Sequence, residues 1–202
     1  MAAQERSGGN VAVLVVDDHP ALRAGLAALL RPAGGLDFVG GAGDERELWP
    51  LLQRTRPDVV VLDYQLPGRD GLLLCREVKA RVTAPAVVLY SAFVGPWLEL
   101  PAALVGADAL VDKGVPGREL CEVVRRVAAG ERLLDPPPAD VVDEAAARLE
   151  PEDLPVLKLL LDRVPPGRIA ATLGLEPGRL GRQLERIVNR LHVPVPATGA
   201  RP

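Results

Sequence analysis

Short apolar runs alternate with segments of helical periodicity along most of the chain. The apolar runs cover residues 11–16, 36–40, 58–62, 86–90 and 108–111. Apolar residues recur at helical spacing in residues 20–31, 44–54, 70–80, 96–105 and 116–129. The runs have the length of β-strands, and the periodic segments have the length of helices. The pattern therefore predicts five strand–helix units, with a short or irregular fourth helix because Pro96 and Pro101 interrupt it.

Five strand–helix units in succession favour an α/β fold. Its core would be a doubly wound parallel sheet with helices on both faces. Residues 59–62, Val-Val-Val-Leu, do not alternate in polarity, as expected for a strand buried on both faces. In such sheets ligands bind at the carboxyl ends of the strands, near the point where the strand order reverses.

A proline run separates this first domain from a smaller helical one. Residues 135–138 read Asp-Pro-Pro-Pro, which cannot continue a helix and favours an extended spacer. We therefore expect a first domain at 10–131, a linker at 132–148 and an all-α domain at 149–194. In the last of these, residues 177–191 carry one apolar stripe. The turn at Gly174 before them is typical of a helix-turn-helix.

Composition and charge narrow the class of protein. The chain has 202 residues, of which 48% are hydrophobic and 3% aromatic, so its core consists mainly of Val, Leu and Ala. The net charge is −3, but basic residues outnumber acidic ones after residue 147, which suggests that the second domain faces a polyanion. Cys75 and Cys121 lie in helical segments and are interpreted as reduced core residues. With no signal-peptide pattern and no apolar run near the roughly 18 residues of a membrane span, we expect a cytoplasmic protein without membrane contact.

Polar side chains stand where the predicted strands end. Asp17 and Asp18 follow the first strand, Asp63 closes the third, Ser91 follows the fourth, and Lys113 comes shortly after the fifth. Carboxylate oxygens suit Mg²⁺, and one carboxylate can act as nucleophile toward a phosphoryl group. A lysine and the metal ion would offset the developing negative charge. The set indicates phosphoryl acceptance on an aspartate.

Each of these residues alone has a simpler explanation. Asp17 or Asp18 could cap the helix that begins near Pro20, Ser91 could be an ordinary loop hydroxyl, and Lys113 could be solvated. His19 invites a phosphohistidine or metal-ligand interpretation, which we disfavour. The occurrence of the whole set, in order, favours the functional interpretation.

The set resembles the receiver domain of two-component response regulators over about residues 10–130. The resemblance rests on residues 15–20, Val-Val-Asp-Asp-His-Pro, and 62–71, Leu-Asp-Tyr-Gln-Leu-Pro-Gly-Arg-Asp-Gly, together with Ser91 and Lys113. It implies that Ser91 and Lys113 hold a phosphoryl group. Where such domains commonly have an aromatic residue in the fifth strand, this chain has Leu110.

The resemblance also implies the remaining roles at this site. Asp63 would be the phosphoacceptor, and a sensor histidine kinase would be its partner. Mg²⁺ would be the cofactor, bound by Asp18, Asp63 and the backbone carbonyl of Gln65. Asp17 would act mainly through a metal-bound water.

The second domain resembles the LuxR-type helix-turn-helix of NarL/FixJ regulators. The matching segments are residues 149–151, 156–160, 169–175 and 184–193. The resemblance implies that the protein binds DNA as a homodimer, with one helix in the major groove. Side chains that could contact phosphates or base edges are Arg168, Arg179, Arg182, Gln183 and Arg186.

Together these features predict a response regulator that controls transcription and is not an enzyme. The main alternative is a regulator whose second domain binds protein instead of DNA, because the usual lysine of the recognition helix is replaced by Gly181. A nucleotide- or flavin-binding enzyme is disfavoured, because Asp17 and Asp18 stand where a glycine-rich phosphate loop would follow the first strand.

Overall fold

The computed structural model describes residues 9–162, 164 and 166–191. The described chain forms two compact units. The first comprises the described residues of 1–94 and 105–135, and the second those of 95–104 and 136–202. None of the helices in the described part of the chain combines the length and apolar character needed to cross a membrane.

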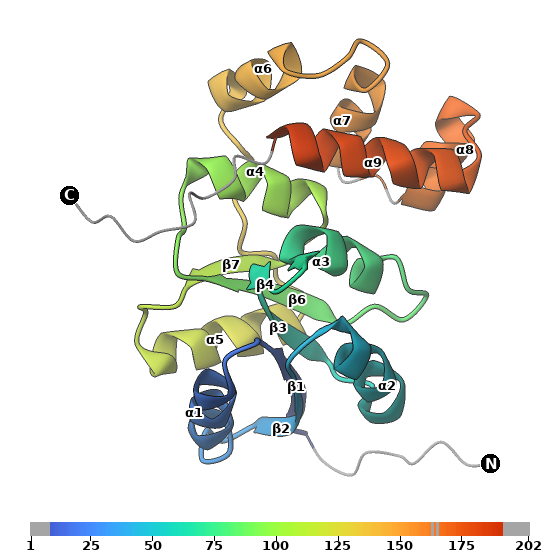
Figure 1. Cartoon of the computed structure of the whole chain (residues 1–202). Helices are drawn as coiled ribbons and strands as arrows, with labels where there is room; N and C mark the ends of the chain where they lie inside the picture. The colour runs from blue at the N-terminus through green and yellow to red at the C-terminus, as the bar shows by residue number, and fades with distance from the viewer. Residues whose placement is uncertain (1–8, 163, 165, 192–202) are drawn as a thin grey trace. The chain divides into compact units, whose positions relative to one another are not determined.

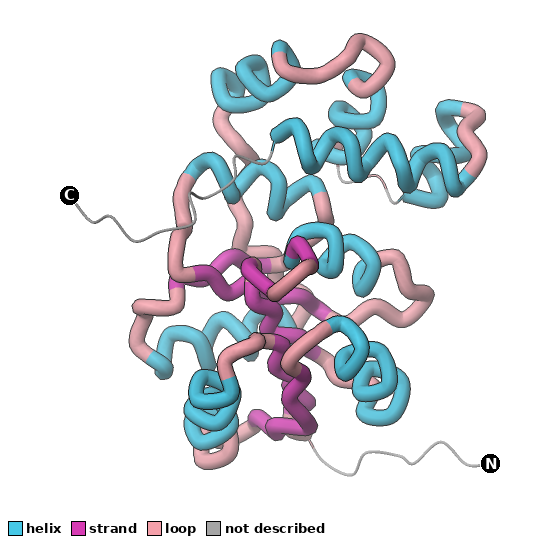
Figure 2. The backbone as a smooth tube through the Cα atoms, viewed as in Figure 1, coloured by secondary structure: helices cyan, strands magenta, loops and turns pink. Residues whose placement is uncertain are grey.

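The first unit is a five-stranded parallel sheet with helices on both faces (Figures 1 and 2), as predicted. Its strands lie in the order β2-β1-β3-β6-β7, and a two-stranded antiparallel hairpin, β4-β5, precedes α3. The elements in chain order are β1 (Val11–Val16), α1 (Pro20–Leu30), β2 (Leu36–Ala42), α2 (Glu45–Thr55), β3 (Val59–Asp63), β4 (Gln65–Leu66), β5 (Arg69–Asp70), α3 (Gly71–Lys79), β6 (Ala86–Ser91), β7 (Ala109–Asp112) and α5 (Gly117–Ala128).

The two faces of the sheet are covered by different helices. The apolar residues of α1 and α5 pack against alternate residues of the strands, such as Val13, Val61 and Val88, in one continuous core cluster. Helices α2 and α3 lie on the opposite face (Figure 1). All five residues of β3 are buried, which explains why the strand has no polar alternation.

Aspartate side chains cap the N-termini of two of these helices. The Asp44 carboxylate accepts a hydrogen bond from the backbone N–H of Glu47 at the start of α2, and the Asp70 carboxylate accepts one from Leu72 at the start of α3. These caps satisfy helix N–H groups that have no partner within the helix. The Asp70 cap also sets where the chain turns after the β4-β5 hairpin.

The second unit is entirely helical. It contains α4 (Pro96–Leu104), α6 (Ala139–Ala147), α7 (Leu154–Leu161), α8 (Pro166–Leu173) and α9 (Pro177–Leu191). Between α8 and α9 the chain turns at Gly174, whose φ of +61° lies in the region that favours glycine. The helix-turn-helix is therefore present. Its predicted end at residue 194 lies outside the described residues.

Helix α4 is the main difference from the predicted domain boundaries. It lies in the sequence between β6 and β7, within the range 10–131 expected for the first domain, but it packs with the helices of the second unit. The physical reason is that Leu100 and Leu104 belong to the same apolar cluster as residues of α7, α8 and α9. The predicted helix forms despite Pro101 inside it.

Candidate functional site

The candidate site lies at the carboxyl ends of β1 and β3. These strands are neighbours, and Val16 pairs with Leu62, so the residues that follow them emerge side by side. The strand order reverses at this point, because β1 pairs with β2 on one side and β3 on the other. Asp17 and Asp63 are both nearly inaccessible to solvent, at 1% and 3% exposure. Two buried carboxylates at one edge need a compensating positive charge.

Lys113 supplies that charge from the end of β7. Its Nζ lies 2.7 Å from Oδ2 of Asp17 and 2.9 Å from Oδ2 of Asp63. The loop that carries the lysine is held to the neighbouring strand, because the backbone N–H of Lys113 donates to the carbonyl of Ser91 at 2.7 Å. The lysine therefore joins three predicted site residues.

The charges in the cluster shift the pKa values of its members. Burial raises the pKa of Asp63 to about 6, although the hydrogen bonds from Lys113 and the backbone of Gln65 oppose this. Burial also acts to raise the pKa of Asp17. Hydrogen bonds from Lys113 and from the backbone of His19 outweigh this effect, so the pKa of Asp17 is lowered. Burial works to lower the pKa of Lys113, but its two carboxylate partners raise it. Near neutral pH, Asp17 and Lys113 are charged and most of Asp63 is ionised.

The donor set fits a hard divalent cation. Ligand atoms of Asp17, Asp18, His19 and Asp63 all lie within 4.8 Å of one another. Oδ1 of Asp18 is buried without a hydrogen bond, although Nδ1 of His19 lies 2.7 Å from it. An orphaned carboxylate oxygen beside two other carboxylates is the arrangement that a metal ion would complete.

The predicted residues Gln65 and Ser91 both follow Asp63 in the sequence. The backbone N–H of Gln65 donates to Oδ1 of Asp63 at 3.1 Å, so the β4-β5 hairpin is tied to the Asp63 carboxylate. Ser91 is 1% exposed, and its hydroxyl is bonded to the backbone of Phe93. A Cβ atom built on Gly71 would lie 2.5 Å from the carbonyl oxygen of Asp63. Glycine is therefore required at this position.

Two residues near the cluster, His19 and Arg69, were not among the predicted site residues. His19, disfavoured as a ligand, lies in the cluster with Nδ1 3.2 Å from Oδ1 of Asp17. Arg69 on the hairpin contacts the carboxylates of Glu45 on α2 and Glu77 on α3, and so attaches the hairpin to two helices. The sequence suggested His19 only as a disfavoured ligand, and no spacing pattern singled out Arg69.

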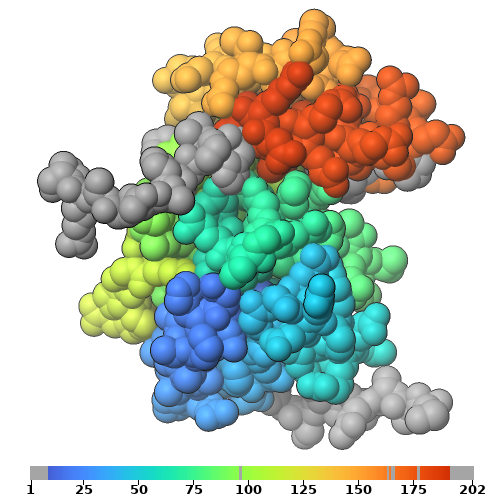
Figure 3. Space-filling model, in the orientation of Figure 1, coloured from blue at the N-terminus to red at the C-terminus, as the bar shows by residue number. Residues whose placement is uncertain are grey.

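The predicted nucleic-acid contacts of the second unit fall into two groups. Arg168, Arg179 and Arg182 are exposed, and they form no ion pair with any residue that the structure describes. One side of α9 lies open on the surface in Figure 3. Gln183, in contrast, is 5% exposed, and its Nε2 donates to the carbonyl of Glu152 at 2.7 Å. It is therefore engaged within the unit.

Arg186 is also engaged within the unit. Its NH2 group lies 3.1 Å from Oε1 of Glu152 and 3.3 Å from Oδ1 of Asp153, which is fully buried. One turn further along α9, Arg190 contacts Glu150 at 2.9 Å. The free arginines thus lie on α8 and the first half of α9, and the paired ones on the second half.

Comparison with known proteins agrees with this geometry. Residues 13–125 match the family described as the response regulator receiver domain. The chain is 39% identical over 125 residues to the DNA-binding transcriptional activator DevR/DosR of Mycobacterium tuberculosis, which covers 62% of this chain and 58% of that protein. It is 29% identical over 194 residues to the probable transcriptional regulatory protein NarL of the same species (strain CDC 1551 / Oshkosh), which covers 91% and 88%.

A solved structure extends the similarity to both units. The response regulator ChrA of a heme-sensing two-component system is 27% identical to this chain, with a TM-score of 0.53 and coverage of 91% of this chain and 90% of that one. The family match covers more than half of the chain and contains the whole cluster of Asp17, Asp63 and Lys113. The chain therefore belongs to the response regulators and carries their receiver domain.

Proposed function

We propose that Asp63 accepts a phosphoryl group from a sensor histidine kinase. The observation that carries the proposal is the position of Asp63, a buried carboxylate that shares Lys113 with Asp17 at the carboxyl edge of the sheet. Because its pKa is about 6, most of Asp63 is ionised and nucleophilic at neutral pH. An Asp63 oxygen would form a bond to phosphorus, and the bond from phosphorus to the donor would break with its electron pair leaving on the donor.

The residues around Asp63 would bind the metal ion, contact the phosphoryl group and orient the Asp63 carboxylate. Asp17, Asp18, Asp63 and the backbone carbonyl of Gln65 would hold Mg²⁺, which when bound offsets the negative charge of the phosphoryl group. Lys113 is already placed to exchange its contact with Asp63 for one with a phosphoryl oxygen. The hydrogen bond from Gln65 orients the acceptor carboxylate.

The phosphoryl transfer is tested by incubating the protein with acetyl phosphate and Mg²⁺ and measuring its intact mass. We expect one adduct on the parent and none on Asp63→Asn. The control is Asp143→Asn, an exposed aspartate on α6, which should form the adduct as the parent does. An adduct that persists in Asp63→Asn would disprove the assignment, and its absence when EDTA replaces Mg²⁺ would support the metal site.

For the output, we infer transcriptional regulation by DNA binding as a dimer. The helix-turn-helix of α8 and α9 supports this, together with the exposed arginines at positions 168, 179 and 182. The first residues of a recognition helix are those that meet base edges in a major groove. The curated relatives named above are transcriptional regulators by name.

A second candidate output is binding to a protein. It is favoured by the burial of Gln183 and the internal pairing of Arg186, which withdraw two of the five predicted contacts from a nucleic acid. The two outputs differ in their salt dependence, because each phosphate contact releases counterions. Binding of the phosphorylated protein to DNA should weaken steeply as salt rises, and Arg179→Ala should reduce that slope. A flat salt response would favour the protein-binding function.

A further inference from the structure

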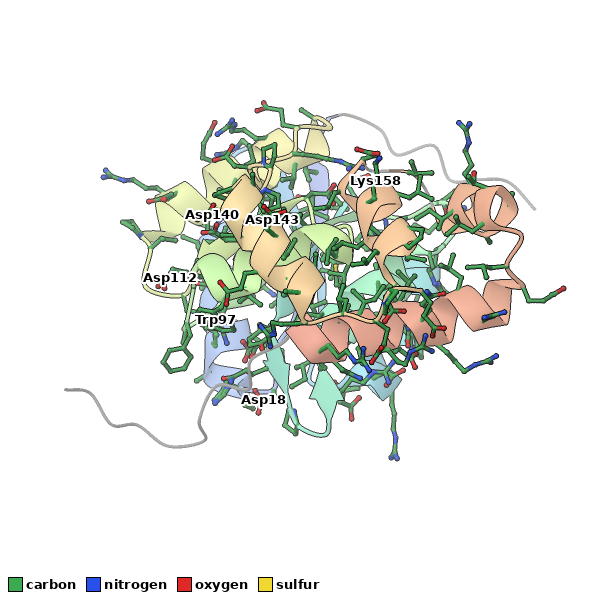
Figure 4. The ribbon with its side chains drawn as sticks, turned by 90° about the horizontal axis from the view of Figure 1, so that it is seen from above. Asp18, Trp97, Asp112, Asp140, Asp143 and Lys158 are labelled. Atoms are coloured by element: carbon green, nitrogen blue, oxygen red, sulfur yellow. The ribbon has the colours of Figure 1, made fainter. Side chains whose placement is uncertain are left out.

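The β4-β5 hairpin lies against the acidic cluster. The backbone N–H of Gln65 donates to Oδ1 of Asp63, and ligand atoms of Asp63 and Asp18 lie within 4.8 Å of each other. Figure 4 labels Asp18 next to the two short arrows of the hairpin. Gln65 itself is exposed, and so are Pro67 and Gly68 at the turn. The strand that carries Gln65 therefore has to be held in place by other residues of the hairpin.

Leu66 and Arg69 are the hairpin residues that face the rest of the unit. They pair directly across the two strands, so their side chains lie on the same face of the hairpin. Leu66 is buried, at 7% exposure. Strands of two residues are too short to form a stable hairpin without further contacts. Arg69 is the only basic residue between positions 65 and 70, and its charge must find partners on the side where Leu66 is buried.

Arg69 finds those partners on two different helices. Its Nε lies 3.3 Å from Oε2 of Glu45 on α2, and its NH2 group donates a hydrogen bond to Oε1 of Glu77 on α3. Nε is buried and forms no hydrogen bond within the described residues, so its contact with Glu45 is an ion pair. The three side chains are 30–35% exposed. Contacts between charges of this exposure weaken as salt rises.

Glu45 is itself held in place by a second contact. Its Oε1 accepts a hydrogen bond from Nε1 of Trp49 at 3.1 Å, while Oε2 contacts Arg69. The guanidinium carbon of Arg81 lies 4.9 Å from the centre of the Trp49 ring and fixes the indole from its other side. Because Glu45 is already ordered, less side-chain freedom is lost when Arg69 contacts it.

We propose that Arg69 is a positioning residue for the metal site. By linking β5 to α2 and α3, it fixes the paired strand β4, so that the carbonyl of Gln65 can bind Mg²⁺ while its N–H orients Asp63. This inference rests on the Mg²⁺ site of the proposed function. Arg69 contacts neither the metal ion nor the phosphoryl group. Residues that orient metal ligands from behind commonly set the affinity of the site.

The positioning role is tested by the dissociation constant of Mg²⁺ alone. Urea unfolding, followed by Trp49 fluorescence in a Trp97→Phe background at rising MgCl₂, gives that constant from the gain in stability. Arg69→Met keeps an apolar side chain without the charge and should raise the constant about tenfold. Loss of a positive charge by itself would favour a cation, so an equal or lower constant would overturn the inference.

Two further variants separate positioning from general effects. Arg69→Lys keeps the charge without the planar fork, so it should restore only part of the affinity. Arg46→Met, the same change at an exposed position of α2, should bind Mg²⁺ as the parent does. The difference between the parent and Arg69→Met should shrink at about 1 M NaCl, where charges are screened within about 3 Å. If Arg69→Met is less stable in EDTA but gains as much from Mg²⁺ as the parent, Arg69 has only a structural role.

A second measurement needs neither metal nor phosphoryl donor. In EDTA, the backbone amides of residues 65–71 should exchange with deuterium roughly fivefold faster or more in Arg69→Met, and at the parent's rate in Arg46→Met. Equal exchange in the parent and Arg69→Met would overturn the inference. If Mg²⁺ does not stabilise the parent, the metal site of the proposed function fails, while the exchange rates still decide whether Arg69 positions the hairpin.

Discussion

Replacing Asp63 with asparagine should stabilise the metal-free protein near neutral pH. The carboxyl is 3% exposed, and burial raises its pKa to about 6 from an ordinary value of 3.8. Each pKa unit corresponds to about 1.36 kcal/mol, so ionisation of the buried group costs the folded state about 3 kcal/mol at pH 7. Asparagine can still accept the hydrogen bond from Gln65 but carries no charge. The variant should recover most of that cost.

The pH dependence has a definite sign. Between pH 3.8 and about 6 the folded state keeps a proton on Asp63 that the unfolded chain has released. The contribution of Asp63 to the parent's free energy of unfolding should therefore fall as pH rises through this window and level off above it. The asparagine variant lacks this contribution, so the difference in stability between the two proteins should grow from pH 4 to pH 7.

The assay is urea unfolding in EDTA, followed by Trp49 fluorescence in a Trp97→Phe background. Trp49 lies on α2 and reports on the first unit. Mg²⁺ should reverse the order of stability, because it favours the ionised carboxylate of the parent. Asp143→Asn, on α6, serves as the control and should not change the unfolding curve. The reasoning is refuted if Asp63→Asn is no more stable than the parent at pH 7 without metal.

Three further substitutions test individual contacts. Gly71→Ala should destabilise the first unit by about 1–3 kcal/mol in urea unfolding, because the new Cβ would lie 2.5 Å from a backbone oxygen. Gly25→Ala, with no atom within 4 Å of its Cβ on α1, should instead stabilise it by about 0.5–1 kcal/mol, and equal effects of the two would contradict the account. Asp108→Ala should cost about 1–3 kcal/mol, because the backbone N–H of the neighbouring strand loses its acceptor; a loss near zero would mean that water replaces it. Gly181→Lys should steepen the salt dependence of DNA binding by about one unit of slope if α9 enters the groove, whereas an unchanged slope would favour the protein-binding function.

The alternation of apolar runs and helical segments was sufficient to predict the sheet and its acidic edge. Residues 59–62 indicate a strand buried on both faces, and the structure places them there. Because parallel strands expose their carboxyl ends at one edge, Asp17, Asp63 and Lys113 could be expected to meet, and they do. The prediction succeeded because the strands, and the polar residues that follow each of them, can be read from short segments of the sequence.

The position of the His19 ring in the cluster and the hairpin contacts of Arg69 could not be predicted in the same way. The partners of Arg69 are Glu45 on α2 and Glu77 on α3, and which acids lie near it depends on how the hairpin is seated between two helices. His19 is next to Asp18 in the sequence, but its ring nitrogen reaches the carboxylates only in the observed turn. Contacts of this kind between side chains leave no periodic pattern in the sequence.

The sequence by itself determined the main elements, the parallel sheet and the acidic edge at which Asp17 and Asp63 lie together. It could not assign α4 to a unit, because Leu100 and Leu104 show only that one face of the helix is buried and not what covers it. It also could not tell that Gln183 is engaged by the carbonyl of Glu152, which is 31 residues away along the chain. Hydrophobic periodicity records whether a face is buried. The partner of that face, and the side chains left free for function, are decided only when distant segments pack together.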